Sequence, residues 1–329
     1  TFFFLLFSTL FLLSLCIIYG YFKIHSLTRI PQNMPIRLSL IQANISPYQK
    51  WEEDFKDKII EKYISLTQRT AKKNPALVVW PETSFPGFWE EERLLREGVL
   101  SLAKEIKTDI LIGSPTWEKG LSYNSAILIS DEGREISRYH KVHLVPFGEY
   151  LPFPKIFGFL QKRFSIGDYA QGKEYTIFKR QLPWTTYHFS ILICFEDIFP
   201  NLVRSFVKNG AEFLINITED GWYGKSSASF QHLQALVLRA VENRRYMVRS
   251  ADTGYSCVIN PWGKIVSELK DEQGEKLFIT GVHTGDVFSN SRKTFYTLFG
   301  DWFIYLCFIS FFLILYKRKK SLNLCLLLL

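Results

Sequence analysis

Alternating apolar and polar segments divide the middle of this chain into short strands and amphipathic helices. Three apolar runs have the length of buried strands: residues 36–42, 76–80 and 110–113. Two longer segments between them repeat apolar residues at spacings of three or four, as amphipathic helices do: residues 51–72 and 90–107. The resulting order of strand, helix, strand, helix and strand predicts an α/β arrangement in layers.

After residue 113 the pattern changes to hairpins and further strands. Residues 125–130 and 135–140 flank Asp131-Glu132-Gly133, a turn signal between two strands. More strands are predicted at residues 177–178, 185–193, 213–217, 247–251, 256–259, 265–269 and 277–282, and helices at 202–208 and 231–243. We therefore expect one α/β domain over residues 36–294, built from two sheets or two halves.

Long apolar segments lie at both ends of the chain. Residues 1–22 carry no charge, and at about 1.5 Å per residue they are long enough to cross a bilayer. Residues 295–316 are also apolar, with Asp301 as their only charge. The first segment could instead be a signal peptide, but it lacks a basic start and a small-residue cleavage pattern. Because the chain begins with Thr1, further membrane helices are expected before it.

These features predict five parts: a transmembrane helix at 1–22, a linker at 23–35, the α/β domain at 36–294, a transmembrane helix at 295–316 and a basic tail at 317–329. The basic cluster Lys317-Arg318-Lys319-Lys320 places the tail in the cytoplasm and the domain on the other side of the membrane. The net charge of +8 suits anionic lipid. Nucleic acid is not an expected partner, because the basic residues are scattered and no binding motif occurs.

Three predicted strands end at residues with catalytic potential. An apolar run stops at Cys194, another precedes Glu82, and the second hairpin strand precedes Lys141. In such a trio the carboxylate takes the thiol proton, the thiolate attacks a carbonyl carbon, and the ammonium stabilises the oxyanion. Other readings of the single residues stay open: Cys194 as a buried small hydrophobe, Glu82 as a helix-capping acid and Lys141 as a solvated surface residue.

The segments around these residues resemble signature blocks of the nitrilase (carbon-nitrogen hydrolase) superfamily. The blocks are Trp80-Pro81-Glu82-Thr83, residues 139–152 (YHKVHLVPFGEYLP) and Ile193-Cys194-Phe195-Glu196. Within the superfamily, the long second block and residues 44–51, 231–234 and 239–243 are most similar to apolipoprotein N-acyltransferases. The resemblance covers about residues 36–282, and the N-terminal membrane part of that family is missing here.

The resemblance implies a fold and a set of roles. The fold is an α-β-β-α sandwich flanked by transmembrane helices. Glu82 is the general base, Lys141 the oxyanion stabiliser and Cys194 the nucleophile, with Glu149, Glu196 and Trp51 in support. No cofactor or metal ion is implied, and the five cysteines do not form a disulfide framework.

The implied reaction is acyl transfer in two steps. A phospholipid donates a fatty acyl chain to Cys194 as a thioester, and the free α-amine of a diacylglyceryl-cysteine apolipoprotein then accepts the chain. The expected setting is the cytoplasmic (inner) membrane, in a multi-pass protein whose catalytic domain faces the periplasm or extracytoplasmic side and which is a monomer. A membrane-anchored amidase of the same superfamily and a catalytically silent scaffold are the alternatives.

Two positions depart from the family pattern. Glu219 stands where the family commonly has Asn, before Asp220, and Asp252 also replaces an Asn. Both departures concern the shape of the pocket and leave the trio intact. The Phe-rich residues 151–164, which follow Glu149, are suited either to dip into the membrane interface or to pack as a long loop against the domain.

Overall fold

The computed structural model describes residues 2–26, 34–161 and 167–327. The chain divides into two compact units, Thr1–Pro35 and Ile36–Leu329. In the first unit the structure describes helix α1 (Phe2–Ser26), which extends beyond the predicted segment 1–22. Residues 27–33 of the predicted linker lie outside the described residues.

The second unit contains two sheets, each with six strands among the described residues. The first sheet has the order β12 (Gly281–Val287), β1 (Ile36–Gln42), β2 (Leu77–Val79), β3 (Asp109–Glu118), β4 (Leu121–Ile129) and β5 (Glu135–His140). The second has the order β11 (Ile265–Glu268), β10 (Cys257–Ile259), β9 (Tyr246–Ala251), β8 (Phe213–Thr218), β7 (Thr185–Ile193) and β6 (Phe178–Leu182).

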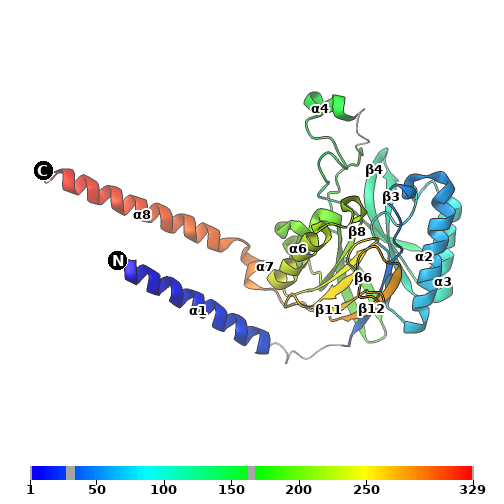
Figure 1. Ribbon diagram of the computed structural model, residues 1–329, viewed down its shortest axis with the longest axis horizontal. Coiled ribbons are helices and arrows are strands. Elements are labelled where there is room, and N and C mark those ends of the chain that lie inside the picture. The colour runs from blue at the N-terminus through cyan, green and yellow to red at the C-terminus, as the bar shows by residue number, and fades with distance from the viewer. Residues whose placement is uncertain (1, 27–33, 162–166, 328–329) are drawn as a thin grey trace. The chain divides into compact units, whose positions relative to one another are not determined.

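Helices cover both outer faces of the paired sheets, as Figure 1 shows for α2 and α3 on one side and α6 on the other. The helices of this unit are α2 (Lys56–Thr70), α3 (Arg93–Ile106), α4 (Pro154–Gln161), α5 (Pro200–Lys208), α6 (Ala228–Asn243), α7 (Phe295–Phe299) and α8 (Trp302–Leu327). Short 3₁₀ helices are η2 (Gln49–Trp51), η3 (Glu53–Phe55), η4 (Ala71–Lys73), η5 (Cys194–Ile198) and η6 (Gly221–Tyr223).

Side-chain alternation along the strands explains the layering. Leu77 and Val79 of β2 belong to the core that the two sheets share, whereas Val78 belongs to the core beneath α2 and α3. Successive side chains of a strand point to opposite faces, so one short apolar strand serves both cores. The predicted α-β-β-α sandwich is therefore confirmed.

Strand directions bring the three strand ends singled out in the sequence to one region. Strands β1, β2 and β3 are parallel, β4 runs against β3, and β5 runs against β4, so β2 and β5 end at the same edge of the first sheet. In the second sheet β7, β8 and β9 are parallel. Glu82 and Lys141 follow the ends of β2 and β5 in the first sheet, and Cys194 follows the end of β7 in the second.

The C-terminal apolar segment is divided. Helix α7 ends at Phe299, the next residue Gly300 has a φ of +62° in the left-handed region, and α8 begins at Trp302. Helix α8 continues to Leu327, through most of the predicted tail 317–329. The sequence predicts a membrane span at each end of the chain; across residues 2–26, 34–161 and 167–327, no helix is both long and apolar enough to cross a membrane.

Helix α4 presents apolar side chains to its surroundings. Ile156 and Phe159 of this helix are 65% and 70% exposed, and Phe153, which directly precedes it, is 70% exposed. In Figure 1 this helix stands away from the two sheets. It occupies the centre of the Phe-rich segment 151–164, of which residues 162–164 lie outside the described residues.

Candidate active site

The three predicted strand ends meet at a cavity of about 700 Å³. Glu82, Lys141 and Cys194 all line this cavity, together with Glu149 and Trp51. The side chains of Glu82 and Lys141 are 8% and 1% exposed, so neither is a solvated surface residue. Glu82 makes no cap to a helix: both of its carboxylate oxygens accept hydrogen bonds from other segments.

Lys141 lies between two carboxylates. Its Nζ is 3.3 Å from Glu82 Oε1 and 2.9 Å from Glu149 Oε1. Burial alone lowers the pKa of Lys141, but the charges of Glu82, Cys194 and Glu149 raise it above its ordinary value. The lysine is therefore a permanent ammonium at neutral pH, suited to stabilise an anion and unsuited to act as a base.

Asn124 of β4 joins the two carboxylates. Its Nδ2 donates to Glu82 Oε1 at 2.8 Å and to Glu149 Oε1 at 2.7 Å. Sequence reasoning missed this residue, although a buried amide inside the apolar strand Leu121–Ile129 is itself a signal. The amide holds both carboxylates on the same side of Lys141.

Replacing Asn124 by Asp should slow acylation of Cys194 by about 10- to 100-fold at pH 7, because two charge-assisted hydrogen bonds are lost and a third carboxylate faces the first two. The measurement is the burst of nitrophenolate released from a p-nitrophenyl fatty-acid ester. Asn209→Asp, which places the same charge at an exposed position after α5, is the matched control. A wild-type burst rate in Asn124→Asp would contradict the bridging role.

Cys194 occupies a strained turn at the end of β7. Its φ of +52° lies in the left-handed region, which for a residue with a side chain costs about 1–3 kcal/mol. Burial and the Glu82 carboxylate raise the pKa of the Cys194 thiol well above its ordinary value, against the lowering effect of Lys141. The resting thiol is therefore protonated, and it would need a base to act as a nucleophile.

Glu196 connects the turn at Cys194 to the loop that follows Lys141. Its Oε1 accepts hydrogen bonds from Tyr139 Oη at 2.7 Å, Val142 N at 2.7 Å and His143 N at 3.0 Å. Its Oε2 accepts one from Ile193 N at 2.8 Å. Glu196 is fully buried and does not line the cavity. Its hydrogen bonds link the end of β5 to the end of β7.

Glu196 should make stability depend on pH. Burial raises the pKa of its carboxyl group to about 7 from 4.5, although hydrogen bonds from Ile193, His143 and Tyr139 lower it. A raised folded-state pKa gives stability that is fully present below about pH 4.5 and is lost as pH rises through about 7. Relative to Glu196→Gln, the wild type should lose about 3 kcal/mol of unfolding free energy over that range.

Chemical denaturation of the detergent-solubilised chain between pH 4 and pH 8 measures this difference. Glu61→Gln, at an exposed position on α2, is the control and should follow the wild type. If the stability curves of wild type and Glu196→Gln ran parallel over this range, Glu196 would not be the titrating group.

The two positions that depart from the family pattern lie at one buried ammonium. Lys50 contacts Glu219 in a short ion pair and Asp252 Oδ2 at 2.7 Å. Burial lowers the pKa of Lys50, but the two carboxylates raise it above its ordinary value. Burial also raises the pKa of Glu219 to about 8, against the effect of Lys50. The backbone N of Glu219 donates to Glu82 Oε2 at 3.0 Å, so this cluster helps to hold the Glu82 carboxylate in place.

Aromatic side chains surround part of the cavity. Trp51, predicted to lie in the active-site region, lines it and is 51% exposed. Trp222 also lines it and makes an edge-to-face contact with Tyr48, at 5.6 Å between ring centroids. The described cysteines Cys16, Cys194, Cys257 and Cys307 are all free thiols, so Cys194 is available for chemistry.

Comparison with known families gives a match over most of the second unit. The profile described as "Carbon-nitrogen hydrolase" matches residues 37–288. Its span contains all of the strands that carry Glu82, Lys141 and Cys194.

Curated relatives and solved structures agree with this match. The chain is 37% identical to an apolipoprotein N-acyltransferase of Geobacter metallireducens, over 95% of this chain and 59% of the relative. It is 33% identical to apolipoprotein N-acyltransferase 2 of Treponema denticola, over 85% of this chain and 55% of the relative. The chain thus spans between half and three fifths of these relatives' length. A crystal structure of an amidase from Nesterenkonia sp. has a TM-score of 0.59, with 18% identity, over 81% of this chain and 96% of the amidase.

Proposed function

Because the chain belongs to the carbon-nitrogen hydrolase family, we propose that it transfers a fatty acyl chain from a phospholipid, through a thioester on Cys194, to the N-terminal α-amine of diacylglyceryl-cysteine apolipoproteins. The observation that carries the proposal is the meeting of Cys194, Glu82 and Lys141 in one cavity. The relatives named apolipoprotein N-acyltransferase support the substrate class.

In the proposed first step Cys194 attacks the ester carbonyl carbon of the phospholipid. The thiol proton passes to the Glu82 carboxylate as the S–C bond forms, and Lys141 stabilises the oxyanion. The oxyanion collapses, the ester C–O bond breaks, and Glu82 returns the proton to the departing alkoxide. The products of this step are the Cys194 thioester and a lysophospholipid.

In the proposed second step the α-amine of the lipoprotein attacks the thioester carbonyl carbon. Glu82 accepts a proton from the amine, the C–S bond breaks, and the proton returns to the Cys194 sulfur. The product is an amide, and the enzyme regains its resting state. Glu149 holds the Lys141 ammonium in place during both steps, which its 2.9 Å contact supports.

We propose a membrane setting for this reaction. Phe3 and Phe7 of α1 and Phe312 of α8 are 82%, 71% and 62% exposed, and lipid is the environment that covers such apolar surfaces. The exposed apolar side chains of α4 support a further contact with the membrane interface. The complete setting is a multi-pass protein of the cytoplasmic membrane, monomeric, with the catalytic domain in the periplasm. In vesicles, a membrane-impermeant maleimide should label Cys16 and Cys307 only after detergent is added.

The decisive experiment offers the chain a phospholipid with a labelled acyl chain and a diacylated lipopeptide. A transferase depletes the free α-amine and forms a labelled amide, whereas an amidase-type hydrolase releases labelled fatty acid and leaves the amine intact. The matched control is the same lipopeptide with its α-amine acetylated, which should receive no label. Release of fatty acid without amide formation would overturn the transferase proposal, and a chain that takes up no label at all would also overturn it.

A further inference from the structure

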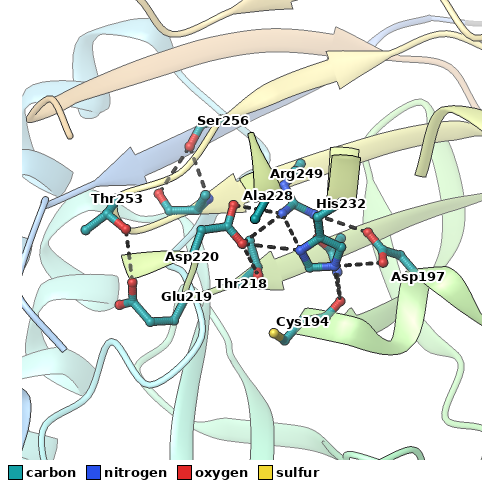
Figure 2. Close-up of polar contacts among 12 residues, drawn as sticks. Cys194, Asp197, Thr218, Glu219, Asp220, Ala228, His232, Arg249, Thr253 and Ser256 are labelled. Carbon is teal, nitrogen blue, oxygen red and sulfur yellow. Dashed lines mark hydrogen bonds and ion pairs between the residues drawn. The ribbon is translucent and has the colours of Figure 1, made fainter. Parts of the chain in front are cut away.

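A buried polar cluster forms hydrogen bonds with the backbone carbonyl of Cys194 and does not line the cavity. The Cys194 carbonyl oxygen accepts hydrogen bonds from Asn216 Nδ2 at 2.9 Å and from His232 Nε2 at 3.2 Å. Figure 2 shows this carbonyl facing the His232 ring while the sulfur points away from it. Asn216 lies on β8 and His232 on α6, so two elements distant in sequence hold one carbonyl.

Arg249 of β9 holds the two donors in place. Its Nη1 donates to Asn216 Oδ1 at 2.6 Å, and its Nη2 lies 2.9 Å from His232 Nδ1. Asn216 and Arg249 are paired in the β8–β9 register, so both side chains lie on the same face of the sheet. Asp197 and Asp220 balance the guanidinium, at 3.1 Å and 2.9 Å.

The contacts of His232 assign a hydrogen to Nε2. The Cys194 carbonyl and Asp197 Oδ1, 2.8 Å away, are both acceptors facing that nitrogen. The hydrogen is therefore present whether the ring is neutral or charged. His232 can donate to Cys194 throughout the reaction, and the donor is not lost when the ring titrates.

The cluster does not contact the cavity. Asn216, His232, Arg249, Asp197 and Asp220 are all buried, and none of them lines the space that Cys194 faces. Burying so many polar groups is unfavourable unless they are paired. Here Asn216 and His232 donate to the Cys194 carbonyl, and Arg249, with its two aspartates, contacts both of these donors. Their contacts therefore point to a function at Cys194, in addition to packing.

We propose that Asn216, His232 and Arg249 are positioning residues that hold Cys194 in its left-handed conformation and so direct its sulfur into the cavity. The carbonyl direction fixes the peptide that follows Cys194, and the cluster fixes the carbonyl. Without it the backbone can relax toward the broad allowed regions, which turns the Cα–Cβ bond and the sulfur with it. The inference rests on the proposed function only in taking Cys194 as the nucleophile.

Alkylation of Cys194 by iodoacetamide tests the proposal without any lipid substrate. The full chain in detergent micelles is alkylated between pH 6 and pH 9, and peptide mass spectrometry follows Cys194 separately from the other cysteines. His232→Leu removes the donor, and Asn216→Asp replaces an amide donor with an acceptor of the same shape next to Arg249. His232→Gln restores an N–H donor. His188→Leu, near the start of the strand β7 that precedes Cys194, is the control.

The expected result is a fall of about 10- to 100-fold in the alkylation rate for folded His232→Leu and Asn216→Asp, at every pH, with the rate in His232→Gln and His188→Leu close to wild type. Thermal unfolding establishes that each variant is folded. A purely structural role lowers melting temperature without this pattern of rescue. If His232→Leu does not fold, Asn216→Asp gives the same comparison.

Two results would overturn the proposal: a wild-type alkylation rate in folded Asn216→Asp or His232→Leu, or an alkylation rate in His232→Gln as slow as in His232→Leu. A wild-type chain that alkylates at Cys194 but transfers no acyl group would overturn the proposed function alone. The two ideas therefore fail in different experiments.

Discussion

Replacing Cys194 by alanine should abolish the covalent acyl adduct that forms when the chain is incubated with phospholipid vesicles. Intact-protein mass spectrometry of the wild type should show a mass increase of one acyl chain, which hydroxylamine removes because thioesters are cleaved by it. The variant should show no increase. Acyl transfer to a lipopeptide should fall by at least about 10⁴-fold, since the remaining residues can bind and polarise the ester but cannot form the intermediate.

The other cysteines provide matched controls for this experiment. Cys257 of β10 is fully buried and does not line the cavity. Cys307 belongs to helix α8. Cys257→Ala and Cys307→Ala should keep the adduct. An adduct of the same mass that survives in Cys194→Ala would assign the nucleophile to another residue and refute the mechanism proposed for Cys194.

The strand ends could be predicted because their signals are local. The apolar run before Cys194 gave β7 its observed bounds, Thr185–Ile193, and the stretch before Lys141 gave the end of β5. Short apolar runs bounded by polar and turn residues are set by neighbours in sequence. The family resemblance then predicted a catalytic role for each of these residues, which an apolar run alone does not indicate.

Residues that support the site could not be placed in the same way. Asn124, Asn216 and Arg249 interrupt apolar strands, which marks them as unusual, but their partners lie on other elements. Tyr139 and Glu196 bond across 57 positions of the sequence. Such contacts depend on how the two sheets pack, and neither composition nor periodicity fixes that packing.

Helix bounds at the C-terminus illustrate a different limit. Residues 295–316 are apolar apart from Asp301 and a few polar residues, yet the helix is interrupted at Gly300, which adopts a positive φ. Hydropathy predicts which residues are buried in an apolar environment, but it does not predict whether a glycine adopts a positive φ and ends a helix. A similar limit applies to Cys194, whose left-handed backbone has no signal in its own sequence neighbourhood.

Glu82 and Glu149 are the two carboxylates that compete for the role of general base. Both contact Lys141 and Asn124, and Glu149 is the nearer to Lys141, at 2.9 Å against 3.3 Å. Glu149 Oε2 also accepts a hydrogen bond from Val145 N at 2.8 Å. Glu82 and Cys194 both line the cavity, and the Glu82 charge, after burial, raises the pKa of the Cys194 thiol. We therefore propose that Glu82 transfers the proton and that Glu149 orients the lysine.

Replacing Glu82 by glutamine should lower the rate of Cys194 acylation by about 10²- to 10⁴-fold at pH 7, the range that loss of a general base produces. Glutamine keeps the shape and one acceptor but cannot take the thiol proton. Loss of the Glu82 charge also removes an effect that raises the pKa of Cys194, so the thiol should ionise at lower pH than in the wild type. The acylation defect should therefore shrink as pH rises, because hydroxide can generate the thiolate without a base.

The burst of nitrophenolate from a p-nitrophenyl fatty-acid ester, measured between pH 6 and pH 10, gives both the rate and its pH dependence. Glu149→Gln is the matched control: it removes a carboxylate at the same lysine but leaves Glu82 in place, and its defect should be smaller and should not shrink with pH. If Glu149→Gln were the more damaging change and its defect were the one relieved at high pH, Glu149 would be the base. The closer lysine contact would then mark the catalytic carboxylate, and Glu82 would take the orienting role.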